Sequence, residues 1–209
     1  YDVKTADFNN DGYLDVVFGN VGAANELWLS ASGVFASAEV NPFGATADNT
    51  YGFDVGDIDN DGDMDLVFPD TDNANSARIF TNNGSAVFTA SDAFLTDTKV
   101  IRLGDLDGDG DLDAVIIDDD TGDTNNFIYY NNGQGVFTQL ANLAGADSYD
   151  IDLVDLDNDY DLDIVIAMGS SVAEKNIIYR NYGELVFSKE LLSDIDQTAS
   201  IAVGDYDSD

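Results

Sequence analysis

The sequence predicts an all-β protein, a β-propeller built from four-stranded blades of about 50 residues each. An acidic motif recurs along the chain in steps of 50, 48, 50 and 50 residues. Each unit holds four short runs rich in β-branched and aromatic residues, separated by Gly, Asn and Asp, and no window has helical periodicity. The five copies of the motif begin at Asp7, Asp57, Asp105, Asp155 and Asp205.

The four runs of each unit predict its four strands in order. A short alternating stretch before the acidic motif, such as VIRLG, predicts the first strand. The run directly after the motif is apolar at consecutive positions, so we expect the second strand to be buried on both faces, between neighbouring blades. These second runs are VVF, LVF, AVII and IVIA. An aromatic or apolar segment such as FIYYNN predicts the third strand, and a run containing Phe after a glycine turn predicts the fourth.

We expect a single repeat domain over residues 1–209. Its four blades are predicted at about 1–50, 51–98, 99–148 and 149–198, followed by the start of a fifth at 199–209. Closed propellers have about four to eight blades, and a fifth unit begins here. We therefore expect these blades to be part of a larger propeller.

The charge balance excludes several classes of partner. The chain has 42 acidic and 7 basic residues and no histidine, which gives a formal net charge of −35. Nucleic-acid phosphates need Lys and Arg, so we expect no nucleic-acid partner, and anionic membrane surfaces are disfavoured for the same reason. No apolar run approaches the roughly 18 residues of a membrane-spanning helix, so we expect no direct membrane insertion.

The acidic residues are concentrated in the motif rather than spread over the chain. Half of the 42 lie in five windows that together make up less than a quarter of the sequence. Such clustering favours cation sites over a general solubility or high-salt adaptation, which is the alternative for so acidic a chain. The windows are 7–15, 57–65, 105–113, 155–163 and 205–209.

The spacing of the motif, Asp-x-Asp/Asn-x-Asp-Gly-x-x-Asp, predicts a calcium loop. Oxygen donors at alternate positions, with a glycine that permits a turn in the sixth, can curl around one hard cation. Ca²⁺ takes about six to eight oxygen ligands and tolerates irregular geometry. The absence of His and Cys excludes ordinary zinc and copper sites. We therefore expect about four Ca²⁺ sites.

We expect the first, third, fifth and ninth residues of each loop to be side-chain ligands and the seventh to contribute its backbone carbonyl. The expected side-chain ligands are Asp7, Asn9, Asp11 and Asp15; Asp57, Asp59, Asp61 and Asp65; Asp105, Asp107, Asp109 and Asp113; and Asp155, Asp157, Asp159 and Asp163. The expected carbonyl ligands are Tyr13, Asp63, Asp111 and Asp161. We expect the side chains of these three aspartates to face solvent.

Two copies depart from the pattern. Tyr160 replaces the glycine of the fourth loop, and a left-handed backbone costs a bulky residue of order 1 kcal/mol, so we expect a weaker site or a shifted turn there. The fifth copy lacks its closing ligands, so we expect an incomplete site at Asp205, Asp207 and Asp209. An EF-hand is excluded, because it needs flanking helices and a bidentate Glu in the twelfth position. The residues in that position are Phe18, Phe68, Ile116 and Ile166.

The stretch GDLDGDGDLDAVI, followed by a strand and NNGQGVF, resembles the FG-GAP/VCBS repeat family. These are the calcium-loop blades of integrin-α-like propellers and of many bacterial surface proteins. The resemblance extends over essentially the whole chain. It implies a β-propeller, often seven-bladed, with calcium loops joining the first two strands of each blade. It implies no particular ligand, because the fold hosts adhesins, lectins, polysaccharide lyases and accessory modules.

Three functions remain open for such a chain. We expect an extracellular binding or adhesion module, secreted or on the cell surface, that recognises a glycan or a protein and uses calcium as a structural staple. Extracellular calcium is near millimolar, which matches sites with affinities of about 10⁻⁴–10⁻³ M. One alternative is a spacer or filament subunit assembled within a large surface protein. The other is a polysaccharide lyase or hydrolase, but without His or Cys no Ser–His or Cys–His nucleophile is available, so we expect no enzyme.

One finer pattern concerns the residue three positions before each motif. Lys4, Asp54, Arg102 and Asp152 occupy this position in the first four units, so the sign of the charge alternates along the chain. Equivalent positions on the innermost strands of adjacent blades lie close together. We therefore expect these charges to pair between blades.

Overall fold

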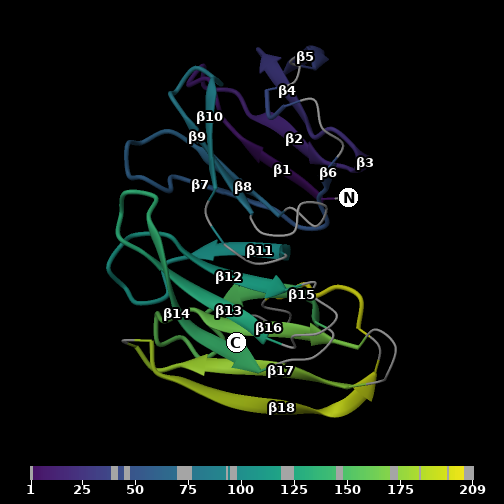
Figure 1. Ribbon diagram of the computed structural model, residues 1–209, viewed down its shortest axis with the longest axis vertical. Helices are drawn as coiled ribbons and strands as arrows, with labels where there is room; N and C mark the ends of the chain where they lie inside the picture. Colours follow the sequence, from purple (N-terminus) through teal and green to yellow (C-terminus); the bar gives the residue numbers. More distant parts are fainter. Residues whose placement is uncertain are drawn as a thin grey trace.

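The protein is an all-β molecule made of four-stranded blades of a β-propeller, shown in Figure 1 as a computed structural model. The structure describes residues 2–38, 42–44, 48–69, 77–92, 94, 98–118, 125–144, 148–169, 174–183, 185–196 and 198–204. Four antiparallel sheets follow one another along the chain, from the purple first blade to the yellow-green fourth blade in Figure 1.

Within each blade the strands pair in sequence order. The first blade is formed by β1 (Asp2–Ala6), β2 (Asp15–Gly19), β4 (Glu26–Ala31) and β5 (Val34–Ala38). The second is formed by β7 (Asp54–Gly56), β8 (Asp65–Phe68), β9 (Arg78–Asn82) and β10 (Phe88–Asp92). The third is formed by β11 (Thr98–Gly104), β12 (Asp113–Asp118), β13 (Asn125–Asn131) and β14 (Phe137–Ala144). The fourth is formed by β15 (Ser148–Val154), β16 (Asp163–Met168), β17 (Glu174–Asn181) and β18 (Phe187–Asp196).

A two-stranded sheet of β3 (Val21–Ala23) and β6 (Asp48–Asn49) lies beside these blades. No sequence pattern predicted it. Its strands come from the loop after β2 and from the segment that leads to the second blade, and Thr50 N donates to the carbonyl of Asn20 at 2.9 Å. This small sheet therefore ties the first blade to the start of the second.

The hydrophobic core lies between consecutive blades. One cluster joins the first and second blades, a second joins the second and third, and a third joins the third and fourth. Alternate residues of a second strand point to opposite neighbours: Ile116 packs toward the second blade, whereas Val115 packs toward the fourth. The prediction that LVF, AVII and IVIA are buried on both faces is confirmed.

The same prediction is wrong for VVF in the first blade. Val17 is fully buried against the second blade, but Phe18 on the opposite face is 41 % exposed. The sequence pattern is the same as in the other blades. The difference arises because no described blade packs against this outer face.

The first strands of adjacent blades are linked by hydrogen bonds between blades. Phe53 N donates to Asp2 Oδ2 at 3.3 Å, and Ile201 N donates to Asp150 Oδ2 at 3.1 Å. In the second blade the equivalent residue is Gly52, which has no side chain, and Ile101 N donates directly to its carbonyl at 3.1 Å. Residues 198–204 therefore lie against the fourth blade in the same way that the second blade lies against the first.

The predicted pairing of charges between first strands is partly confirmed. Lys4 Nζ lies 3.0 Å from Asp54 Oδ1. Arg102, however, pairs with Asp150 at 3.0 Å and reaches Asp2 at 3.9 Å, so its expected pairing with Asp152 is wrong. The guanidinium is long enough to reach two positions along the neighbouring strand, where Asp150 also accepts the bond from Ile201.

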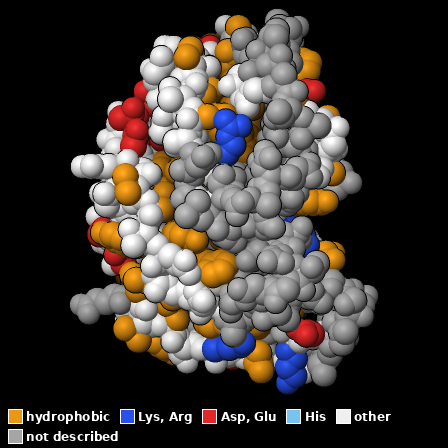
Figure 2. All heavy atoms as spheres, viewed as in Figure 1, with side chains coloured by type: hydrophobic (Ala, Val, Ile, Leu, Met, Phe, Trp, Pro, Cys, Tyr) orange, Lys and Arg blue, Asp and Glu red, His pale blue; other side chains and the backbone are white. Residues whose placement is uncertain are grey.

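Acidic side chains gather along the left margin of the molecule in Figure 2, whereas Lys and Arg side chains are scattered. The described part of the chain contains no helix that is long and apolar enough to cross a membrane.

Candidate metal centres

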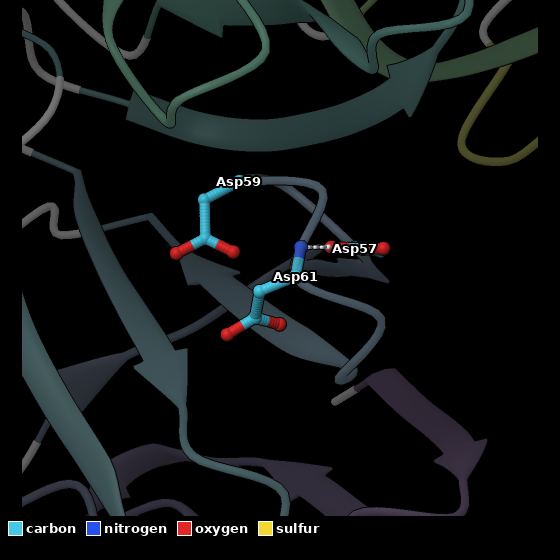
Figure 3. A group of neighbouring side chains, drawn as sticks. All are labelled: Asp57, Asp59 and Asp61. Carbon is cyan, nitrogen blue, oxygen red and sulfur yellow. Dashed lines mark hydrogen bonds between the residues drawn. The ribbon is translucent and has the colours of Figure 1, made fainter.

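Each complete acidic motif forms a loop between the first and second strands of its blade. The first aspartate closes the loop by accepting backbone N–H groups, as at Asp57, where Oδ1 accepts from Asp61 N at 3.1 Å and Oδ2 from Gly62 N at 3.0 Å. The fifth residue then accepts from the seventh: Asp63 N donates to Asp61 Oδ1 at 2.9 Å. Figure 3 shows this loop with the side chains of its first, third and fifth residues. These bonds curl the backbone so that alternate side chains converge.

The ninth aspartate is fully buried in every complete loop and joins the loop to the third strand. Asp113 Oδ2 accepts from Leu106 N at 3.1 Å, while Oδ1 accepts from Asn131 N at 2.9 Å. The same pair of bonds recurs at the other ninth positions, Asp15, Asp65 and Asp163. This residue therefore stabilises the loop whether or not it also binds a cation.

Three loops bring three carboxylates together closely enough to hold one metal ion. In each group one oxygen per residue lies within 4.8 Å of the others, and ligands that bind one Ca²⁺ at about 2.3–2.6 Å can be no more than about 5 Å apart. Among the described residues, the first loop forms no such group of three carboxylates, and its third position is the amide Asn9. The groups are Asp57, Asp59 and Asp61; Asp105, Asp107 and Asp113; and Asp155, Asp157 and Asp159.

The remaining expected ligands lie in the same loops but outside these groups, so their role stays a prediction. In the third loop Asp109 Oδ2 accepts a hydrogen bond from the Tyr130 hydroxyl at 3.1 Å. The carbonyl role expected for the seventh position also stays a prediction. The fifth motif, Asp205, Asp207 and Asp209, lies outside the described residues.

The electrostatics of the second loop fit a bound cation. Oδ1 of Asp59 is buried and accepts no hydrogen bond from the described residues. Burial, together with repulsion from Asp61 and Asp57, raises the pKa of Asp59. A buried carboxylate oxygen without a partner is costly, and a cation is the partner that would satisfy it. The other possible metal ligands of this loop are carboxylate and carbonyl oxygens as well, so the site fits a hard cation.

The buried ninth aspartates predict how the metal-free protein responds to pH. Burial raises the pKa of both Asp65 and Asp113 to about 6, from a usual value of 3.8. The folded state therefore binds more protons than the unfolded state between these values, so its free energy of unfolding falls as the pH rises through this window. We expect the melting temperature of metal-free protein to increase by several degrees when the pH is lowered from about 7 to about 5. Calorimetry of protein stripped of metal on a chelating resin measures this change, and a lower melting temperature at about pH 5 would contradict the prediction.

Two of the side chains in the seventh position, those of Asp63 and Asp111, accept hydrogen bonds from a neighbouring loop, which was not expected. The solvent-facing side chain expected at Asp161 stays a prediction. Asn10 Nδ2 donates to Asp63 Oδ1 at 2.8 Å, and Asn60 Nδ2 donates to Asp111 Oδ1 at 2.6 Å. The donors come from the loop of the preceding blade, which the spacing within one motif does not reveal. Adjacent acidic loops are therefore linked to each other.

Sequence reasoning missed an asparagine at the end of the third strand. Asn131 Nδ2 donates to the carbonyl of Ile58 in the second loop at 2.8 Å and to that of Leu112 in its own loop at 3.1 Å. Asn82 and Asn181 make the same bonds in their blades, and Ser30 occupies this position in the first. The signal was present in the sequence, because Asn82, Asn131 and Asn181 recur with the period of the motif.

Tyr160 has the same left-handed backbone conformation as the glycine in this position of the other loops. Its φ is +75°, close to the +94° of Gly62, and its N–H donates to Asp155 Oδ2 at 3.0 Å, as Gly62 does to Asp57. The side chain is 94 % exposed. The turn of the fourth loop is therefore not shifted, and the strain of a left-handed tyrosine is retained.

Comparison with known proteins agrees with this architecture. The model of the FG-GAP-like repeat family matches residues 7–68 and 105–166, more than half of the chain. Each match begins at the first aspartate of one acidic loop and ends in the second strand of the next blade. A search of curated proteins found no significant match. The chain belongs to the FG-GAP-like repeat family.

Proposed function

We propose that the protein is an extracellular, calcium-stabilised β-propeller module that binds a glycan or a protein. The FG-GAP propeller fold fits a ligand-binding or adhesion module. The observation that carries the calcium part is the buried Oδ1 of Asp59, which has no hydrogen-bond partner among the described residues and lies in a loop whose possible metal ligands are all oxygens. Ca²⁺ suits such a site better than Mg²⁺, because it accepts more oxygens and less regular geometry.

We propose that the blades belong to a propeller of about seven blades, as is frequent in this family. The outer face of the first blade supports this proposal. A pocket of about 540 Å³ on that face is lined by apolar side chains that include Phe18, Trp28 and Phe35. The residue equivalent to Phe18 is Phe68 in the second blade and Ile116 in the third, and both are buried by the preceding blade. A further blade would cover the exposed face in the same way.

A second pocket, of about 450 Å³, offers a polar site for a ligand. It lies along the first strands, toward their N-terminal ends, whereas the acidic loops follow their C-terminal ends. Tyr51 and one face of Tyr149 supply aromatic surface, since Lys99 Nζ lies 4.1 Å from the centroid of the Tyr149 ring. Arg102 and Asp150 supply a paired donor and acceptor. Aromatic faces combined with fixed polar groups suit recognition of a polar ligand such as a sugar. We propose no catalytic residues.

The alternative is a spacer or filament subunit in a larger surface protein. The same exposed apolar face favours it, because a second molecule could cover the first blade instead of a further blade. Both functions use calcium for rigidity. The two functions differ at the pocket along the first strands, which binds a ligand in the binding module and needs none in the spacer or filament subunit.

A glycan array probed with the protein in calcium and in EDTA tests the proposed function. We expect a restricted set of glycans to be retained, with binding lost in EDTA and weakened about tenfold or more by Tyr149→Ala, since loss of an aromatic contact of about 1.4 kcal/mol has this effect. Tyr182→Ala is the matched control, because Tyr182 is exposed and lies outside the pocket. No retained glycan, together with polymers detected by light scattering, would support the alternative.

A further inference from the structure

A positively charged side chain from β17 lies against the fourth acidic loop. Arg180, the penultimate residue of β17, donates from its NH1 to Asp163 Oδ2 at 2.8 Å. Asp163 is the ninth residue of the loop and is fully buried. The guanidinium is also held by Glu190 on β18, whose Oε2 lies 3.7 Å from Nε. Arg180 is therefore fixed against the loop from the side of the third strand.

The equivalent residues of the other blades are uncharged. Strand register places Tyr130 at this position in the third blade and Thr81 in the second, each directly before the asparagine that joins two loops. Leu29 has this position in the first blade, directly before Ser30. Tyr130 also contacts its acidic loop, through the bond from its hydroxyl to Asp109. The position thus faces the loop in more than one blade, and it is cationic in the fourth alone.

Arg180 changes what the ninth aspartate can offer to a metal ion. Among the bonds of the described residues, Oδ2 of Asp113 accepts one N–H, from Leu106, and keeps a second lone pair. Oδ2 of Asp163 accepts two donors, Leu156 N at 3.2 Å and Arg180 NH1. Oδ1 of Asp163 accepts from Asn181 N at 2.8 Å. Asp113 belongs to the carboxylate group of the third loop, whereas the groups of the second and fourth loops lack their ninth aspartates. Among the described ninth aspartates, Asp163 alone accepts a hydrogen bond from a guanidinium.

We propose that Arg180 is a built-in counter-cation of the fourth loop, and that this loop binds Ca²⁺ at least about tenfold more weakly than the second and third loops. The guanidinium occupies a lone pair of the ninth aspartate and repels a divalent ion nearby; even in a water-like dielectric, charges of +1 and +2 about 5 Å apart weaken binding by about tenfold. We then expect the stability of the fourth loop to depend less on calcium than that of the second and third loops. This inference rests on the proposed calcium binding.

The tyrosine in the sixth position does not account for the weaker calcium binding that we propose for the fourth loop. Tyr160 adopts the backbone of the glycines in the other loops, and its N–H makes the equivalent bond to Asp155. Its side chain points to solvent, with 94 % of its surface exposed. The backbone path of the fourth loop therefore matches that of the others, and Arg180 is the difference that acts on the carboxylates themselves.

Calcium titration of the intact chain by calorimetry and equilibrium dialysis tests this role. We expect Arg180→Met to gain one site relative to the natural sequence, with the affinity of the fourth loop raised about tenfold or more. Arg180→Gln keeps an N–H donor for Asp163 without the charge, so it reports the effect of charge if the methionine variant folds poorly. Adding Asp157→Asn to either variant assigns the gained site to the fourth loop by removing it.

Lys189→Met is the matched control, because it removes one positive charge from the same blade at a residue that lies over the ring of Tyr179 instead of the loop. A gain of equal size in this control would overturn the inference in favour of net charge. A larger gain from Tyr160→Gly than from Arg180→Met would overturn it in favour of the backbone. Unchanged stoichiometry in both Arg180 variants, with calcium still bound at other loops, would also overturn it. Loss of calcium binding at every loop would instead refute the proposed function.

Discussion

Removal of calcium should lower the melting temperature of the protein by roughly 10–30 °C. A site with an affinity of about 10⁻⁴–10⁻³ M stabilises the folded state by about 1.4–2.7 kcal/mol at about 10 mM free calcium. Three such sites, one in each of the first three loops, contribute about 4–8 kcal/mol, and each kcal/mol shifts the melting temperature of a domain of this size by about 2–4 °C. Differential scanning calorimetry in calcium and in EDTA measures the shift.

The controls separate a bound ion from general screening of charge. A net charge of −35 is also screened by sodium, so NaCl at the ionic strength of the calcium buffer is the reference. Equal melting temperatures in NaCl and in CaCl₂ would contradict the calcium sites. Magnesium should protect less, because it demands a tighter and more regular arrangement of ligands.

Asp59→Asn should change the stability of the protein in opposite directions in EDTA and in calcium. The substitution keeps the shape of the side chain but removes the charge from a buried oxygen that accepts no hydrogen bond from the part of the chain that the structure describes. We expect the variant to be more stable than the natural sequence in EDTA and less stable in calcium, where the ligand charge is needed. Destabilisation of equal size in both buffers would show that Asp59 has a structural role only.

Asn131→Asp should destabilise the protein by about 3–5 kcal/mol, which is the range for an uncompensated buried charge. Asn131 has no exposed surface, and its Nδ2 donates to the carbonyls of Ile58 and Leu112. A carboxylate there would place a negative oxygen against two carbonyl oxygens and close to Asp113, which binds its backbone N–H. Because the bond to Ile58 joins the second and third blades, we expect the substitution to weaken the contact between these two blades.

The adjacent residue provides the control for this substitution. Asn132 is exposed, and its Oδ1 accepts a hydrogen bond from Gln134 N at 3.0 Å, which an aspartate can also accept. Asn132→Asp adds the same charge one position along the chain, and we expect it to change the free energy of unfolding by about 0.5 kcal/mol or less. Urea unfolding of the two variants compares them directly. Similar midpoints for both would contradict the role of Asn131.

The sequence by itself was enough to predict the blades and their acidic loops. The period of the motif, the paired apolar faces of runs such as AVII and the turn glycines are local patterns, and local backbone preference determines them. The hydrogen bonds that curl each loop are also local, because Asp57 and Gly62 are five residues apart. These features therefore follow from one unit read alone.

Contacts between blades were decided by the tertiary structure. The bond from Asn60 to Asp111 spans 51 residues, and the bond from Asn131 to Ile58 spans 73. Which residues meet at such separations depends on how far each blade is rotated and shifted against the next, and a repeat in one dimension does not specify this offset. For the same reason Arg102 was paired with the wrong aspartate, and the exposed face beside Phe18 was not predicted.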